Sequence, residues 1–172
     1  VVREDLTIRG RDGSRLEWDG IGPLIIHHAG RLTLADLRLA RVGGYDGLVH
    51  STGRLIADQV GFEGAAPWYT LAEPRPTHSA GGARCDATVH LAKGAHFTAR
   101  GCSWTDNRAP VLLLTERARA TVHGGDFGEA PQPGFSVSGA GTLSLQRVHA
   151  STLDGPVSVG GTEASLRMGR CV

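Results

Sequence analysis

Basic side chains recur at long, regular intervals in this sequence. The four residues are Arg31, Arg54, His96 and Arg119; the first and last intervals are about 23 residues, and the middle interval is about 42 residues. Hydroxyl residues lie two positions after the last two, at Thr98 and Thr121. Guanidinium groups bind carboxylates and sulfates through paired hydrogen bonds, and hydroxyl groups exchange hydrogen bonds with sugar hydroxyls. If the fold brings these residues together, they could hold an acidic glycan; the alternative is an ordinary solvated sheet face.

Acidic residues offer fewer arrangements that could be catalytic. The short interval separates Asp106 from Glu129, and the long interval separates Asp58 from Arg100, so both pairs follow the spacing of the basic residues. Two stacked carboxylates could share a proton or a cation, which suits glycoside hydrolysis or calcium-assisted lyase chemistry. The alternatives are turn carboxylates that splay apart, and a plain salt bridge between Asp58 and Arg100.

Histidine and cysteine residues do not predict a metal site. His27 and His50 are separated by the short interval and could stack, but the same series continues as Ala92, Thr115 and Ser138. A catalytic zinc site needs three protein ligands, and the three cysteines form no CxxC pair. We expect Cys102 and Cys171 to be small core residues.

The intervals belong to a repeat that runs through the chain. Relative to Leu32, the equivalent positions are Leu55, Phe97, Ala120, Leu143 and Ala164. Further apolar or small residues recur two, five and seven positions later, so each unit alternates with the period of a strand and not that of a helix. Units of about three short strands cannot bury their apolar side alone, whereas stacked units can.

The predicted fold is therefore all-β, a single parallel β-helix, or solenoid, over residues 1–172. It would have about seven coils of 21–23 residues, with like positions about 4.8 Å apart. The 25 glycines fit its many turns. Its narrow interior is expected to leave little room for large rings, in line with the 5% aromatic content.

Composition excludes several classes of protein. The apolar fraction of 40% and the net charge of +1 are not those of a disordered chain. No apolar run approaches the ~20 residues of a transmembrane helix, and no signal peptide is evident. The near-neutral charge gives no case for nucleic acid as a partner. The chain begins without methionine, which is compatible with a piece of a longer protein.

Two segments carry a resemblance to a known group. The opening Leu6-Thr-Ile-Arg-Gly10 with Leu16-Glu-Trp-Asp-Gly20, and the Gly-Arg-Leu coils at Gly30 and Gly53, resemble the right-handed parallel β-helix superfamily, the pectate-lyase-like group. The resemblance implies a right-handed cylinder of three parallel sheets, and it favours an extracellular or cell-envelope location. Its members include polysaccharide lyases, glycoside hydrolases, epimerases, adhesins and structural modules, so fold alone does not choose a function.

One functional pattern of that superfamily is incomplete here. In its lyases an arginine acts as base beside several calcium-binding aspartates, whereas this chain offers only Asp58 beside Arg100. Calcium is therefore expected only if the chain is a lyase, and no other cofactor or metal is predicted.

The long interval contains an insertion, predicted as a loop over about residues 63–86, with the adjacent aromatics Trp68 and Tyr69. Binding residues concentrate on such loops, although these rings could instead cover the coil. We expect a non-catalytic binding or scaffold module that recognises a glycan or another cell-surface polymer. The expected ligand-binding residues are Arg31, Arg54, His96, Arg119, Thr98, Thr121, Trp68 and Tyr69. The alternatives are a polysaccharide lyase or hydrolase, and a structural spacer whose insertion docks a protein partner.

Overall fold

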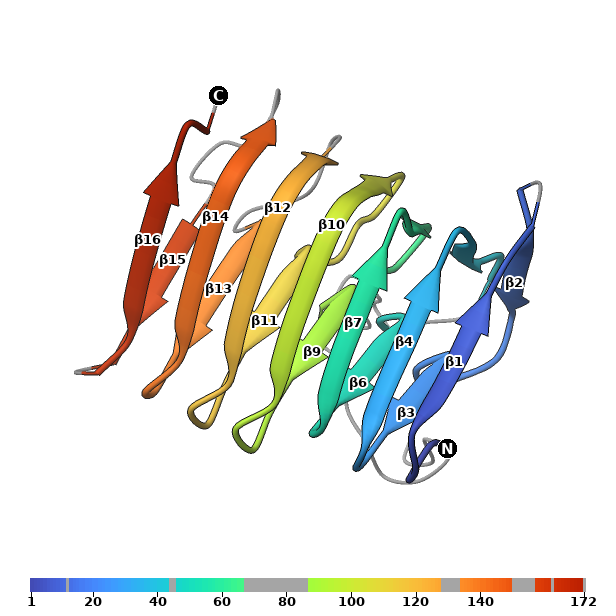
Figure 1. The fold of residues 1–172 in the computed structure, drawn as a ribbon, viewed down its shortest axis with the longest axis horizontal. Helices are drawn as coiled ribbons and strands as arrows, with labels where there is room; N and C mark the ends of the chain where they lie inside the picture. The colour runs from blue at the N-terminus through green and yellow to red at the C-terminus, as the bar shows by residue number, and fades with distance from the viewer. Residues whose placement is uncertain are drawn as a thin grey trace, which may run out of the picture.

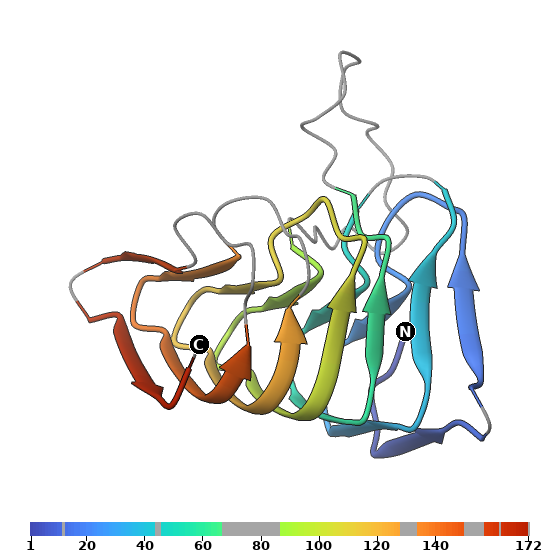
Figure 2. The same ribbon diagram turned by 90° about the horizontal axis from the view of Figure 1, so that it is seen from above.

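Three strand-built faces wind around one apolar interior (Figures 1 and 2). The computed structural model describes residues 1–11, 13–43, 46–66, 87–127, 134–149, 157–161 and 163–171. All of its paired strands are parallel, apart from one isolated antiparallel bridge between Asp46 and Ala66. The predicted parallel β-helix, a solenoid, is confirmed.

The first face carries the reference positions of the repeat. Its strands, in order, are β1 (Leu6–Arg9), β4 (Arg31–Ala35), β7 (Arg54–Asp58), β10 (His96–Thr105), β12 (Arg119–Phe127), β14 (Thr142–His149) and β16 (Ser165–Gly169). Seven strands lie on this face, and the chain makes about six complete turns between the first and the last of them. The predicted number of seven coils therefore corresponds to the number of strands on this face. In Figure 1 these strands run upward in front of the third face while the chain advances from right to left, which is a right-handed winding.

The second face is built partly from separate strands and partly from bent ones. Its separate strands are β2 (Arg15–Trp18), β5 (Arg38–Arg41) and β8 (Gly61–Glu63). From β10 onward one strand bends through the corner: His96–Arg100 pairs with β7, and Ser103–Thr105 pairs with β8. The first two faces therefore form one ten-stranded sheet.

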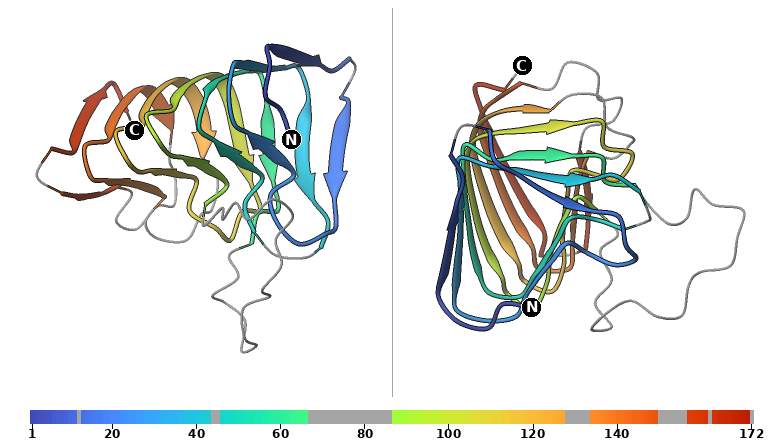
Figure 3. Two further views of the ribbon diagram at one scale, coloured as in Figure 1. Left: turned by 90° about the horizontal axis from the view of Figure 1, so that it is seen from below. Right: turned by 90° about the vertical axis from the view of Figure 1, so that its right-hand side faces the viewer.

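The third face is a separate six-stranded sheet. Its strands are β3 (Ile25–His27), β6 (Val49–Ser51), β9 (Val89–Leu91), β11 (Leu112–Leu114), β13 (Phe135–Ser138) and β15 (Val157–Gly160). Looking along the solenoid shows the stacked coils around their common interior (Figure 3, right).

A left-handed backbone conformation makes the corner between the first two faces. From β4 onward it occurs four residues after the reference position in each turn, with φ near +55°. The residues are Asp36, Gln59, Gly101, Gly124, Arg147 and Arg170. Only glycine adopts this conformation without steric cost, so the four other residues are retained there against their own preference.

The interior is formed by the predicted apolar positions. Leu32, Leu55, Phe97, Ala120 and Leu143 are all buried, and so are the residues two positions later. The last turn corrects the prediction, since Leu166 and not Ala164 pairs with Leu143. The final interval is thus the same as the other short ones, and every assigned position in that turn moves by two.

Aromatic rings also occupy the interior, which contradicts the expectation of little room for them. Phe62, Trp104 and Phe127 stack on successive turns, with ring centroids 5.0 and 4.3 Å apart and planes within 17° of parallel. Phe135 meets Phe127 edge-on. Flat rings fit because they stack face to face at nearly the separation of neighbouring strands.

Cys102 and Cys171 occupy equivalent positions as free thiols; Cys102 is buried in the core, and Cys171 is partly buried against it. Each thiol lies near a carbonyl of its own turn and one of the preceding turn. Burial raises the pKa of Cys102 to about 11, so this thiol is protonated at neutral pH. Three steps of about 4.8 Å separate the two residues, far beyond disulfide reach.

Candidate functional site

Four basic side chains form a row across the first face. The strand register pairs Arg31 with Arg54, Arg54 with His96, and His96 with Arg119. All four are exposed. Arg54 and His96 lie on neighbouring strands despite the long interval between them in the sequence. Neighbouring strands are about 4.8 Å apart. We call Arg31, Arg54, His96 and Arg119 the basic row.

The hydroxyl residues form a second row beside it. Thr98 pairs with Thr121, and both are half-buried on the outward side. The row extends to Thr33 and Ser144 but is interrupted at Ile56. Hydroxyls here stand two residues along the strand from the basic row, which places them on the same side of the sheet.

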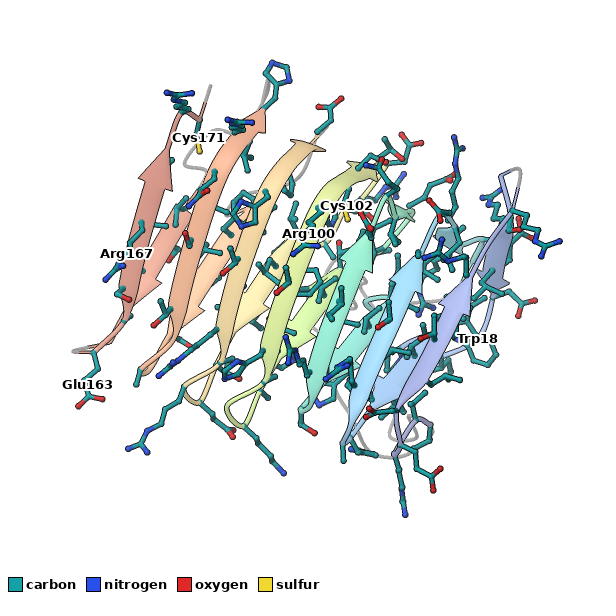
Figure 4. All side chains as sticks on the ribbon, viewed as in Figure 1. Trp18, Arg100, Cys102, Glu163, Arg167 and Cys171 are labelled. Carbon is teal, nitrogen blue, oxygen red and sulfur yellow. The ribbon has the colours of Figure 1, made fainter. Side chains whose placement is uncertain are left out.

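The last turn adds no basic side chain to the basic row. Ser165, and not Glu163, pairs with Thr142, and Arg167 pairs with Ser144 in the hydroxyl row. Figure 4 shows Glu163 below the start of β16 and Arg167 on the strand itself. Glu163 therefore lies outside the basic row, and Arg167 adds an arginine to the outward face of the sheet.

The basic row carries positive charge without acidic partners. Among the described residues, no ion pair involves Arg31, Arg54, His96 or Arg119; the ion pairs present lie elsewhere, such as Arg9 with Asp36 and Arg15 with Glu63. The nearest acid contact is a hydrogen bond from the Arg31 backbone amide to the Asp5 carboxylate. These guanidinium groups remain available to an external anion.

The catalytic candidates are only partly placed. Asp58 and Arg100 pair in the register of β7 and β10, as the spacing predicted. No ion pair joins these two described side chains, in contrast to the expected salt bridge. Asp106 is exposed in a left-handed turn conformation. Glu129 lies outside the described residues, as do Trp68 and Tyr69 of the predicted loop.

The histidine prediction is wrong in its pairing. His27 pairs with Ser51, while His50 pairs with His90 and meets its ring edge-on at 5.0 Å. The connection from the third face to the next first-face strand varies in length between turns, so equal sequence spacing does not give equal positions there. Within the described ranges, no group of three or more His, Cys, Asp or Glu residues could hold a metal ion.

His27 is a buried core residue with a defined tautomer. Its Nε2 lies 2.8 Å from the Ala29 carbonyl, which can only accept, so Nε2 carries the proton. Its Nδ1 accepts from the Ser51 hydroxyl at 2.9 Å. Burial lowers the pKa of His27, in part offset by the bond to the Ala29 carbonyl.

This histidine predicts a pH dependence of stability. The unfolded chain binds a proton at the ordinary pKa of about 6.5, whereas folded His27 resists it. The contribution of His27 to the free energy of unfolding is therefore fully present above that pH and is lost as the pH falls below it. We expect the stability gap between wild type and His27→Gln to narrow between pH 7.5 and pH 5, measured by urea unfolding. A gap of equal size at both values would contradict this assignment.

The described residues contain no helix that is long and apolar enough to cross a membrane. Comparison of the chain with protein-family models, with curated proteins and with solved structures finds no match. The functional argument therefore depends on the geometry of the chain itself.

Proposed function

We propose that this solenoid is a non-catalytic binding module for an acidic polymer, most simply a carboxylated or sulfated glycan. The observation that supports it is the basic row: four exposed basic side chains, in register on neighbouring strands, with no ion pair to any described acid. A linear polyanion laid along the solenoid would meet one basic side chain per turn over these four turns, and the neighbouring Thr98 and Thr121 offer hydroxyls to its sugar rings.

Membership of the pectate-lyase-like superfamily is part of the same proposal. It is supported by the right-handed parallel winding and by the equal short intervals between successive turns. The rigid sheet holds the row in place without a partner, so little ordering of the protein opposes binding.

The test is binding of polygalacturonate and of a sulfated glycan by wild type and by Arg54→Ala/Arg119→Ala. We expect the double variant to bind at least about tenfold more weakly at low salt, because two charge-assisted contacts are lost. Its affinity should also depend less on salt. The matched control is Arg38→Ala/Arg108→Ala, which removes the same charge from exposed positions outside the row and should change affinity less than about threefold.

Two outcomes would overturn the proposal. Equal losses in both double variants would show that only net charge matters. Release of unsaturated or reducing ends from the polymer would instead favour a lyase or hydrolase, for which the register leaves Asp58 and Arg100 as neighbours.

A further inference from the structure

Three arginines surround a hollow at the C-terminal end of the first face. The hollow has a volume of about 480 Å³ and is lined by two neighbouring segments, 144–147 of β14 and 167–170 at the end of β16. Arg147, Arg167 and Arg170 are all exposed. None of the three forms an ion pair with another described residue.

Glycine forms the floor of this hollow. Gly169 pairs with Gln146 in the register, at a position where the preceding turns carry the outward side chains of Arg100, His123 and Gln146. A Cβ built at Gly169 meets no atom within 4 Å, so the space above it is open. The missing side chain therefore leaves a gap on an otherwise covered strand surface, bordered by Arg167 two residues earlier and Arg170 one residue later.

The two corner arginines are held in an unfavourable backbone conformation. Arg147 and Arg170 have φ of +54° and +53°; the same corner carries Gly101 and Gly124 in two earlier turns, and Asp36 and Gln59 in two others. The corner thus forms with glycine at lower steric cost, and the turn itself does not require arginine. Strained residues of this kind concentrate at binding sites, where the side chain has a role outside the turn.

The one described acidic residue of the last turn lies away from the hollow. Glu163, the acid of the last described turn, lies at the opposite end of β16 (Figure 4). Ser144 and Gln146 add a hydroxyl and an amide to the rim of the hollow. The hollow is thus lined by three arginines and polar neighbours, together with the apolar residues Leu145 and Met168.

We infer that this hollow binds a tetrahedral oxyanion, the sulfate or phosphate ester group of a ligand. An ester of this type presents three terminal oxygens, which three separate guanidinium groups can approach together, whereas a carboxylate presents two. The site shares no residue with the basic row. Anion binding in the hollow can therefore be tested independently of the proposed polymer binding, and either one can fail without the other.

The corner conformation allows an unusually clean test, because replacing either corner arginine by glycine removes the charge and relieves the backbone. We expect Arg147→Gly and Arg170→Gly to keep or raise the Tm while weakening the binding of inorganic sulfate and phosphate at least about tenfold. Arg167→Gln removes the third fork from a regular strand position and should weaken binding similarly. The Gly169 backbone amide signal in NMR titrations reports binding at the site itself.

The matched control is Gln59→Gly, which makes the same backbone change at the same corner but far from the hollow. It should raise or keep the Tm and leave anion binding unchanged. Titrations with a sugar 6-sulfate and a sugar 6-phosphate distinguish the two ester sources, and acetate tests the preference for a tetrahedral group. Unchanged sulfate and phosphate affinity in the arginine variants, acetate binding as tight as sulfate, or no shift at Gly169 in wild type would each overturn the inference.

Discussion

Trp104→Ala is expected to lower the free energy of unfolding by about 3–5 kcal/mol, as is usual when a buried aromatic ring is removed. Trp104 is only 2% exposed and stacks between Phe62 and Phe127. Its loss leaves a cavity between two rings that the sheet holds a fixed distance apart, so the neighbours cannot close it. Urea unfolding followed by far-UV circular dichroism measures the change.

Trp104→Phe is the control for this prediction. The indole Nε1 is buried without an acceptor among the described residues, so phenylalanine removes an unsatisfied donor while keeping the stack. The rings on either side are already phenylalanine. We expect Trp104→Phe to lie within about 1 kcal/mol of wild type, since the lost volume and the lost donor have opposing effects. If both variants lose the same stability, the stack is not what stabilises the core here.

Asn107→Ala is expected to cost about 1–3 kcal/mol, because it leaves the buried Ala65 amide without its acceptor and removes a bond to the Phe62 carbonyl. The Asn107 side chain is 3% exposed. It accepts from the Ala65 amide at 2.9 Å and donates to the Phe62 carbonyl at 3.0 Å. It thereby joins two successive turns where regular strand pairing ends. The same unfolding measurement applies.

Asn107→Asp separates the two bonds. An aspartate still accepts from the Ala65 amide, but it cannot donate to the Phe62 carbonyl and buries a charge. A protonated carboxyl group can donate again. The deficit of Asn107→Asp relative to wild type should therefore shrink as the pH is lowered towards about 4. A deficit that does not depend on pH would show that the Phe62 contact contributes little.

Much of the fold follows from the sequence because parallel stacking turns equal spacing into adjacency. Leu32, Leu55 and Phe97 alternate with outward residues at the period of a strand, and in-register pairing makes them neighbours even across the long interval. The basic row follows by the same logic. Its placement needed only the register of one face, which the apolar residues specify strongly because a slip of one residue would expose them.

The sequence did not specify the last turn. Ala164, Leu166 and Met168 alternate in the same way, so two registers that differ by two residues both point apolar side chains inward. The structure selects Leu166, and this places Arg170 at the left-handed corner and Cys171 in line with Cys102. A search of the sequence at four residues after each reference position could have found Arg147, but not why its backbone conformation matters.

The alternation of apolar and polar residues by itself determined a parallel solenoid, the outward row of Arg31, Arg54, His96 and Arg119, and the inward position of Cys102, because strand period and stacking are local rules. The tertiary structure alone decided which turns lengthen and which corner the backbone takes. These features depend on left-handed backbone conformations and on connection lengths. The residue types at those positions follow no repeating pattern that the sequence would show. The pairing of His50 with His90 and the three-arginine hollow over Gly169 arise at that level.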